Sequence, residues 1–591
     1  MGKHAGPTRL GRKKTKTIST GAGNTIRTRP LPLRSTVRLR RPAEARHWHK
    51  PAFSAAVAIG LPDLALLALD RMDLVLYTSA GAMCALYGHN KPYAARARTV
   101  AWVILGMIAS LAVGLVSSSF LDSTVLLVLI ASALAAVHKM MCDAVRIGPP
   151  GNLIITFISA SAFFVPQRPG DIPVHLLLAV AGGAVAWLVC MAPWLVRPEG
   201  PQRIATARAL EAAAGLLRAA PDAAVGPRHA TAAAVNAAWQ TIFLVPARSA
   251  AKYAARARLE RLLVRAESAL AVADVPAEEH AAEAERFAGW ARDLRRGRPL
   301  PEVTLDAGQT AELAGIAADQ EGTALDLRRP SPDHPRGFRA VLRQLRPGSP
   351  LLPLGARVLI GCTLAGWASM AIGSEHPYWA VVTAASVFQA NTTLSWQRAV
   401  QRALGNLLGL LLFTALLPVI HTGHLAMVLL VILFQIGAEA WIPRNYWLGS
   451  VCVTPMALLL TSFGNAMPAG VLVRDRWVDT VVGGIIGLVC CVLVTNRRAT
   501  DRIEAAMGHV AAAREAAAAV LAADRPDDLE AGWARDRLAA ALVELREAVE
   551  VASGEWWQRA LPAERVALAE RDGHRTLARL VRHLSAPALA A

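Results

Sequence analysis

The stretch HPYWAVVTAASVFQANTTLSWQRAVQRALGNLLG, residues 376–409, decides how this chain folds, because it joins two apolar runs through a basic connection. Tyr378 and Trp379 at its start carry the amphipathic rings typical of a membrane interface. The apolar run that follows leads to Arg398 and Arg402, which are four residues apart and therefore share one helical face. The stretch predicts a membrane span and its basic cytoplasmic turn, from which the chain enters the membrane again.

Composition also places the whole chain in the membrane class. Of its 591 residues, 54% are hydrophobic and only 18% are charged, a mix seldom seen in soluble proteins of this length. The formal net charge of +19 would suit a nucleic-acid-binding protein as well, but the basic residues lie between and around the apolar runs. We therefore expect the lipid bilayer, and no nucleic acid, as a partner.

Twelve apolar runs are long enough, or nearly so, to cross a bilayer. The first six are 51–69, 72–89, 100–119, 123–141, 152–166 and 174–196, and the second six are 353–373, 377–392, 403–420, 424–442, 446–463 and 477–495. Lys and Arg gather in alternate loops, which predicts that both termini and the central segment are cytoplasmic. The predicted fold is all-α and polytopic, with about twelve transmembrane helices and helical cytoplasmic regions.

The two sets of spans resemble copies of one six-span unit. DLVLYTSAGAMCALYGHNKPYAARARTVAWVILGMIASLAVGL and PYWAVVTAASVFQANTTLSWQRAVQRALGNLLGLLLFTALL both give an apolar arm, a basic turn and a glycine-containing arm. An even number of spans per unit predicts parallel repeats, related by an axis along the membrane normal. The predicted domains are a basic, disordered tail (1–50), the first membrane half (51–196), a cytoplasmic helical domain with a linker (197–350), the second membrane half (351–498) and a cytoplasmic helical region (499–591).

The segments outside the spans are alanine-rich and predict amphipathic helices. In AAKYAARARLERLLVRAESALAVA, residues 250–273, one helical face carries Leu259, Leu262, Leu263, Ala266 and Leu270. Arg256 and Glu260 lie four residues apart on another face, where they can pair. Residues 505–523 and 535–552 predict two further helices that pack antiparallel to each other.

Four motifs of the second half together carry a family resemblance. They are His376 to Trp379, the pair Arg398 and Arg402 before a glycine-containing helix, Arg444 to Tyr446 followed by Thr454-Pro455, and Asp479-Thr480 with Gly483. The chain resembles the fusaric acid resistance protein-like family of bacterial inner-membrane proteins, which includes the aromatic acid exporters. The strong match covers residues 351–498, whereas the first half keeps only PYAARAR (92–98) and RIGPPGNLIITF (146–157).

The resemblance implies a multi-pass transporter of the bacterial plasma membrane, with both termini cytoplasmic, that exports small aromatic or lipophilic organic anions by secondary transport. It also implies kinship with the plant aluminium-activated malate transporters. A passive organic-anion channel and a non-transporting membrane scaffold are the alternative functions. Besides the bilayer and the anion, a homo-oligomer and a periplasmic adaptor are compatible partners.

Candidate substrate-binding residues combine positive charge with amide or hydroxyl groups near the cytoplasmic ends of spans. They are Arg398, Arg402, Gln389, Asn391, Arg444, Asn445 and Tyr446. A guanidinium matches the geometry of a carboxylate. Membrane anchoring by snorkelled arginines and helix bridging by amides are the structural alternatives.

Candidate proton-coupling residues are the acids within or near spans, namely Asp63, Glu439 and Asp479. A charge at mid-bilayer costs on the order of 3 kcal/mol, so each of these acids needs a partner or a purpose. The structural alternative is an ion pair of Glu439 with Arg444, or of Asp479 with Arg476.

The sequence predicts no enzyme chemistry, no cofactor and no metal. It has no H-E-x-x-H and no G-x-S-x-G, and Arg12 of GPTRLGRKKT stands where a phosphate-binding loop needs lysine. The seven cysteines lie in or beside apolar runs without a C-x-x-C pair, which indicates small buried side chains and neither disulfides nor a zinc site.

Overall fold

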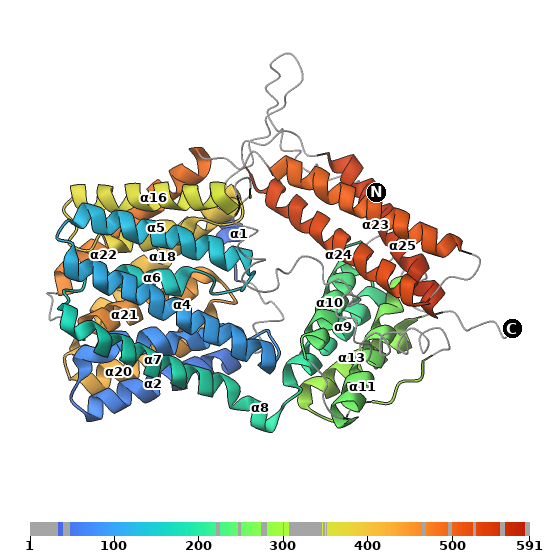
Figure 1. Ribbon diagram of the computed structural model, residues 1–591, viewed down its shortest axis with the longest axis horizontal. Helices are drawn as coiled ribbons and strands as arrows, with labels where there is room; N and C mark the ends of the chain where they lie inside the picture. Colours follow the sequence, from blue (N-terminus) through green and yellow to red (C-terminus); the bar gives the residue numbers. More distant parts are fainter. Residues whose placement is uncertain are drawn as a thin grey trace, which may run out of the picture.

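The computed structural model consists of a bundle of apolar helices and a separate helical domain beside one end of it (Figure 1). It describes residues 33–39, 48–219, 225–245, 250–272, 280–299, 301–305, 346, 349, 351–463, 469–493, 499–523, 528–555 and 562–585. Throughout these residues the regular structure is helical, without strands. We call the bundle end that faces the helical domain the proximal end, and the opposite end the distal end.

The bundle contains all twelve predicted spans as helices or helical segments. The first half holds α2 (His49–Ala68), η2–α3–η3 (Met72–Leu74, Val75–Ala82 and Met83–Leu86), α4 (Tyr93–Phe120), α5 (Thr124–Ala144), α6 (Leu153–Ala162) and α7 (Ile172–Met191). The second half holds α16 (Leu351–Ala371), α17 (Tyr378–Val387), α18 (Thr392–Ala415), α20 (His424–Trp441), α21 (Tyr446–Ser462) and α22 (Ala469–Leu493). The all-α polytopic membrane fold is thereby confirmed.

The outer surface of the bundle has the character of a lipid-facing wall. Seven described helices are long and apolar enough to cross a membrane, and only 28–44% of their apolar windows is buried inside the protein. Large apolar side chains point outward instead, with Phe53 71%, Trp102 68% and Phe120 68% exposed. A bilayer is the environment in which such a surface is stable.

The two halves have the same internal contacts and also interlock. Helix α7 packs on α3 and α4 as α22 packs on α17 and α18, and α4 meets α6 as α18 meets α21. Across the halves, α2 packs against α20 of the second half, and α16 packs in the same way against α5 of the first. This exchange explains why the halves form one bundle rather than two separate modules.

Glycines fix how the two halves correspond residue by residue. A Cβ added at Gly182 of α7 would overlap the carbonyl oxygen of Thr78 in α3, and one added at Gly483 of α22 would lie 2.5 Å from the carbonyl oxygen of Ala380 in α17. Both helix pairs therefore touch backbone to backbone, as small residues permit. Gly182 corresponds to Gly483 and Thr78 to Ala380 in this register.

Two predicted spans are shorter than expected. Helix α17 covers 378–387 of the predicted 377–392, and α6 covers 153–162 of the predicted 152–166. Each has ten residues, or about 15 Å of helix, which is half of a bilayer core. Every residue of α17 is buried, so protein rather than lipid surrounds the irregular backbone next to it.

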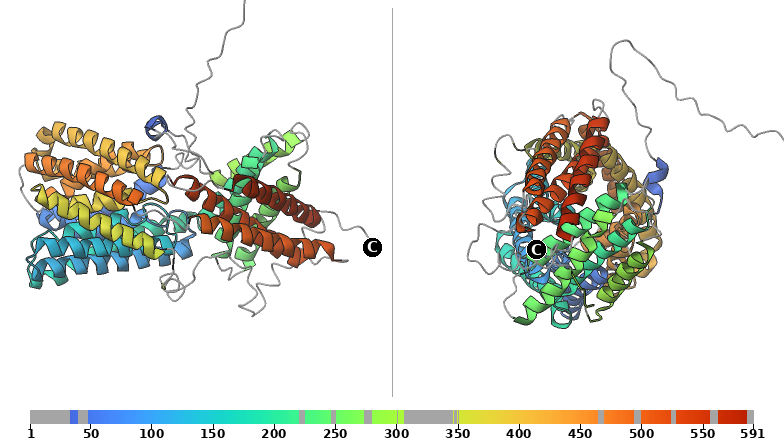
Figure 2. Two further views of the ribbon diagram at one scale, coloured as in Figure 1. Left: turned by 90° about the horizontal axis from the view of Figure 1, so that it is seen from above. Right: turned by 90° about the vertical axis from the view of Figure 1, so that its right-hand side faces the viewer.

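The extramembrane helical domain combines the central segment with the C-terminal region. It consists of α9 (Gly200–Leu217), α10 (Val225–Phe243), α11 (Ala250–Glu267), α12 (Ala269–Val272), α13 (Ala281–Arg296), α23 (Ala499–Ala522), α24 (Asp528–Ser553) and α25 (Ala563–Ser585). These helices share one hydrophobic cluster, although they come from two segments that the sequence divided into separate domains. Figure 2 shows that this domain stays beside the bundle, rather than around it, in the perpendicular view as well.

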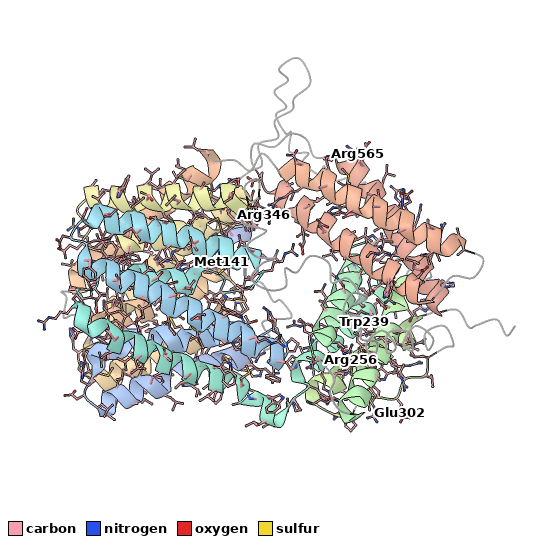
Figure 3. The ribbon with its side chains drawn as sticks, viewed as in Figure 1. Met141, Trp239, Arg256, Glu302, Arg346 and Arg565 are labelled. Atoms are coloured by element: carbon pink, nitrogen blue, oxygen red, sulfur yellow. The ribbon has the colours of Figure 1, made fainter. Side chains whose placement is uncertain are left out.

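Local predictions for this domain hold in detail. All five residues of the predicted face, Leu259, Leu262, Leu263, Ala266 and Leu270, are buried. Arg256 pairs with Glu260 at 2.7 Å, and Figure 3 shows Arg256 and the cluster residue Trp239 on neighbouring helices of the domain. Arg535 of α24 is joined to Glu267 of α11 at 2.8 Å, so a buried ion pair connects the two sequence segments. Sequence reasoning missed α25.

The predicted disordered tail contains a short helix, α1 (Leu33–Val37), which lies against α18. The rest of that tail, apart from 38–39 and 48–50, lies outside the described residues, as does the part of the predicted linker from 306 to 345. All seven cysteines are free, and five of them are buried.

Candidate functional site

Helix α18 carries the first part of the candidate site on one face. It begins at Thr392, where the Asn391 side chain caps it by accepting a hydrogen bond from the Leu394 amide at 2.9 Å. The prediction that Arg398 and Arg402 belong to a turn is therefore wrong, although their shared helical face is confirmed. Arg402 lies about 15 Å along the helix and is only 7% exposed.

Both arginines of α18 meet Tyr446, the first residue of α21. Arg402 donates from Nη1 to the Tyr446 hydroxyl at 2.9 Å, and the Arg398 guanidinium lies 3.8 Å from the centre of the Tyr446 ring. The contact is a cation–π interaction, which is stronger where water is excluded. Within the described part of the chain, no carboxylate forms an ion pair with either guanidinium.

Deeper in the bundle, a chain of neutral hydrogen bonds joins three helices. Thr454 donates to the Asn406 side-chain oxygen at 2.7 Å, and Asn406 donates from Nδ2 to the Thr480 hydroxyl at 2.7 Å. All three residues are buried. This contact explains two of the sequence motifs, because Thr454 precedes Pro455 and Thr480 follows Asp479.

Arg476 of α22 is a charged side chain buried inside the bundle. It is 2% exposed, and its guanidinium lies 4.8 Å from the centre of the Trp379 ring. Nε and Nη1 are buried without a hydrogen-bond partner, and among the described residues no carboxylate forms an ion pair with Arg476. It interacts electrostatically with Arg402 and Asp479. We call Arg398, Arg402 and Arg476 the arginine cluster.

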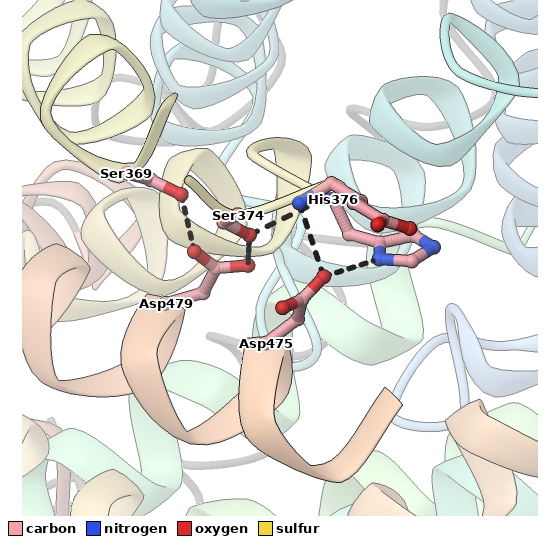
Figure 4. A network of polar contacts seen from close by, with 6 residues as sticks. Ser369, Ser374, His376, Asp475 and Asp479 are labelled. Carbon is pink, nitrogen blue, oxygen red and sulfur yellow. Dashed lines mark hydrogen bonds and ion pairs between the residues drawn. The ribbon is translucent and has the colours of Figure 1, made fainter. Parts of the chain in front are cut away.

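Sequence reasoning missed Arg476 as a site residue and treated it only as a partner for Asp479. The signal was nevertheless present, since Arg476 stands directly before the apolar run 477–495, and an arginine buried there needs a counter-charge as much as an acid does. Asp479 interacts with Arg476 electrostatically but forms no ion pair with it. Ser369 and Ser374 donate hydrogen bonds to its two carboxylate oxygens, the latter at 3.0 Å (Figure 4).

The turn between α16 and α17 binds the part of α22 that carries Arg476. Asp475, one residue before Arg476, accepts from the Glu375 amide at 3.0 Å and lies 2.9 Å from Nδ1 of His376 (Figure 4). His376 in turn stacks on Trp379, with ring centres 5.3 Å apart. Two buried carboxylates therefore clamp the His-Pro-Tyr-Trp motif onto α22.

The first half has no arginine at the corresponding place. In the glycine register, Tyr77 corresponds to Trp379 and His175 to Arg476, and the two rings are stacked 3.8 Å apart. Gln167 gives both rings a hydrogen-bond partner. It donates to the Tyr77 hydroxyl at 2.5 Å, and its Oε1 lies 2.8 Å from Nδ1 of His175. The two halves share one architecture, but in the described residues the first half has a hydrogen-bonded histidine where the second has Arg476, whose Nε and Nη1 lack a hydrogen-bond partner.

Several predicted site residues serve the structure instead of facing the arginine cluster. Gln389 donates to the Ser386 carbonyl at 2.9 Å, and Asn391 binds the carbonyl of Glu550 in α24 at 3.3 Å. Asn445 caps α21, as the acceptor for the Trp447 amide. Arg444 donates to the Ala440 carbonyl and lies 5.2 Å from the Trp441 ring.

The two other predicted acids lie on other helices. Asp63 of α2 is fully buried, accepts from Ser79 at 3.2 Å and has an unpartnered Oδ2. Glu439 of α20 meets Gln435 at 3.4 Å, and in the described residues it forms no ion pair with Arg444. In the same residues no three of His, Cys, Asp and Glu gather as metal ligands.

Comparison with known proteins finds a family match that covers this site. Residues 363–490 match the family model described as fusaric acid resistance protein-like, so the resemblance predicted from the motifs is confirmed for this region. The chain is 24% identical over 534 residues to the uncharacterized membrane protein YvaC of Bacillus subtilis, covering 86% of this chain and 81% of YvaC. A shorter match, 28% identical over 140 residues, relates 24% of the chain to 18% of the uncharacterized protein slr1298 of Synechocystis. No solved structure matches significantly.

Proposed function

We propose that this protein is a secondary transporter that exports small aromatic or lipophilic organic anions across the bacterial plasma membrane. The observation that carries the proposal is Arg476, a buried guanidinium whose Nε and Nη1 have no partner. A buried charge that lacks a partner is costly, by several kcal/mol even after relaxation. A site that binds an anion transiently has a reason to keep such a charge.

The surroundings of Arg476 favour a carboxylate with an apolar body. Guanidinium nitrogens present a planar set of donors that fits a carboxylate with two parallel hydrogen bonds. The face of Trp379 already contacts the guanidinium, and the rings of Tyr378 and His376 pack against Trp379. An aromatic or lipophilic acid matches both features, whereas a small hydrophilic acid matches only the charge.

The second half offers a route of polar groups from one end of the bundle to the other. Arg398 and Arg402 with Tyr446 stand toward the proximal end, the Asn406, Thr454 and Thr480 hydrogen bonds follow, and Arg476 lies nearest the distal clamp. We propose that the proximal end is cytoplasmic, because the basic loops and both termini belong to that side by the positive-inside rule. An exported anion would then meet the arginines in the order 398, 402, 476.

Energy coupling is a separate part of the proposal. Asp479 lies next to the arginine cluster, so a proton bound there would change the charge that Arg476 experiences. Asp63 and Glu439 remain further candidates for proton transfer on other helices. A homo-oligomer and a periplasmic adaptor remain predictions.

Transport by purified protein in proteoliposomes tests the proposal. The substrates are benzoate and salicylate, with acetate as an aliphatic control and benzamide as an uncharged control. We expect flux of the two aromatic acids, driven by an imposed pH gradient, and its loss in Arg476→Gln. Arg96→Gln is the matched control, since Arg96 is also buried, at 7% exposed in α4, but binds the Gly88 and His89 carbonyls.

The alternatives give different results in the same experiment. A passive channel would carry current without dependence on the pH gradient. A scaffold would show no flux of any acid, and Arg476→Gln would then leave the cellular phenotype of the protein intact. Absence of flux for the whole panel, in vesicles that contain correctly folded protein, would refute transport.

A further inference from the structure

Helix α1 is held at the proximal end of the bundle by side chains that bind its backbone carbonyls. Gln401 of α18 donates to the Thr36 carbonyl at 2.9 Å, and Asn445 donates to the same carbonyl at 3.0 Å and to that of Arg38 at 3.0 Å. Trp447 donates from its ring nitrogen to the Val37 carbonyl at 3.3 Å. Three consecutive backbone carbonyls of the N-terminal segment therefore accept hydrogen bonds from three side chains.

The residues that hold α1 are sequence neighbours of those that build the arginine cluster. Gln401 precedes Arg402, and Asn445 and Trp447 flank Tyr446, which binds both Arg398 and Arg402. Gln401 also donates to the side-chain oxygen of Asn445 at 2.9 Å, so α18 and α21 present one continuous donor surface. Any movement of α1 acts on the same helix turns that place the arginines.

Helix α1 depends on this surface for its structure. It has five residues, far fewer than a helix needs to be stable alone in water. Leu33 in the helix and Leu39 just after it are 53% and 56% exposed, so the segment lies at the surface of the bundle. A short segment held by a few hydrogen bonds can leave and rebind.

We propose that residues 33–39 form a strap that covers the proximal entrance to the arginine cluster and opens to admit the anion. The partner of the donor surface made by Gln401, Asn445 and Trp447 is thus the N-terminal segment of this same chain. The covering role rests on the proposed transport function, whereas the docking of the strap does not. Asn445, chosen from the sequence as a substrate-binding residue, holds the strap in this view.

Amide hydrogen exchange of the full-length protein tests the docking. Asn445→Asp keeps the oxygen that caps α21 but removes both donors to the strap, and Gln401→Glu removes another. We expect exchange in residues 33–39 to rise about ten-fold in Asn445→Asp, since two hydrogen bonds are lost. Asn391→Asp is the matched control, because Asn391 caps α18 at the same bundle end without touching the strap. Equal exchange of 33–39 in Asn445→Asp and wild type would refute the docking.

Thiol labelling tests the covering role without any transport measurement. A cysteine placed by Arg398→Cys is labelled with a water-soluble maleimide, and the wild-type protein gives the background from its own cysteines. We expect Asn445→Asp to accelerate labelling about five-fold or more, and Asn391→Asp to leave it unchanged. Unchanged labelling in Asn445→Asp would refute the cover. Absence of benzoate flux in wild-type vesicles would refute the proposed function alone.

Discussion

Replacing Arg476 by methionine is expected to stabilise the protein and to abolish anion binding at once. Methionine has a similar length but no charge, so the substitution removes a guanidinium that is 2% exposed and lacks partners for Nε and Nη1. A guanidinium buried without an ion-pair partner costs about 3 kcal/mol or more. The cation–π contact with Trp379 offsets about 2 kcal/mol of this destabilisation, because water is excluded there. The net gain in stability of Arg476→Met is about 1 kcal/mol or more.

Arg96→Met is the matched comparison, and we expect the opposite sign. Arg96 is also buried, but it donates to the Gly88 carbonyl at 3.0 Å and to the His89 carbonyl at 2.5 Å. Hydrogen bonds from a charged group contribute about 1.5–3 kcal/mol each. Removal of both therefore outweighs the relief of the buried charge, and Arg96→Met should be less stable by about 2 kcal/mol.

Thermal unfolding of the solubilised protein, followed by tryptophan fluorescence, measures both effects. Benzoate at 100 times its dissociation constant should stabilise wild type and Arg96→Met by about 2.7 kcal/mol and should leave Arg476→Met unchanged. A lower melting temperature of ligand-free Arg476→Met than of wild type would refute the unpaired-charge argument. Stabilisation of Arg476→Met by benzoate would refute Arg476 as the anion-binding group.

Three further predictions follow from packing and from titration. Gly483→Ala should destabilise the bundle by about 1–3 kcal/mol, because its Cβ would lie 2.5 Å from the Ala380 carbonyl oxygen, whereas Gly484→Ala, with nothing within 4 Å, should be tolerated in the same unfolding measurement. Gly554→Ala should detach α24 from the turn before α18, because the added Cβ would overlap the Asn391 side-chain amide. Amide hydrogen exchange of residues 391–395 should then rise. Gly508→Ala, at a position with nothing within 4 Å, should leave that exchange unchanged. Burial lowers the pKa of His574 in α25 from 6.5 to about 4. The extramembrane domain should therefore keep its full stability above pH 6.5 and lose up to about 3 kcal/mol as the pH falls to 4. Acid unfolding monitored by circular dichroism should show a smaller loss of stability in His574→Gln.

The spans and the amphipathic faces could be predicted because they depend on local patterns. An apolar run long enough to cross a bilayer favours a helix, because a helix satisfies its own backbone hydrogen bonds. The buried face of α11 likewise follows from the spacing of Leu259, Leu262 and Leu263 alone. Boundaries were less accurate, since the polar residues around Arg398 suggested a turn where α18 continues.

The site was predicted only in part, because its members are brought together by helix packing. Arg398, Arg402 and Tyr446, which were chosen because each stands in a recognisable motif, do contact one another, and their binding role stays a prediction. Asn391 and Asn445 were also chosen as binding residues, yet their amides cap helices and hold α24 and α1. Spacing along the chain does not tell whether a polar side chain faces a site or a neighbouring helix end.

The sequence by itself determined that this chain crosses the membrane in two related halves and that the second half carries the family motifs. The tertiary structure alone decided that α2 and α16 pack across the halves and that two extramembrane segments share one core. It alone placed Arg476 over Trp379, whereas the first half has His175 on Tyr77. Hydropathy and charge are properties of a segment, but whether a buried cation has a partner depends on which helices meet around it.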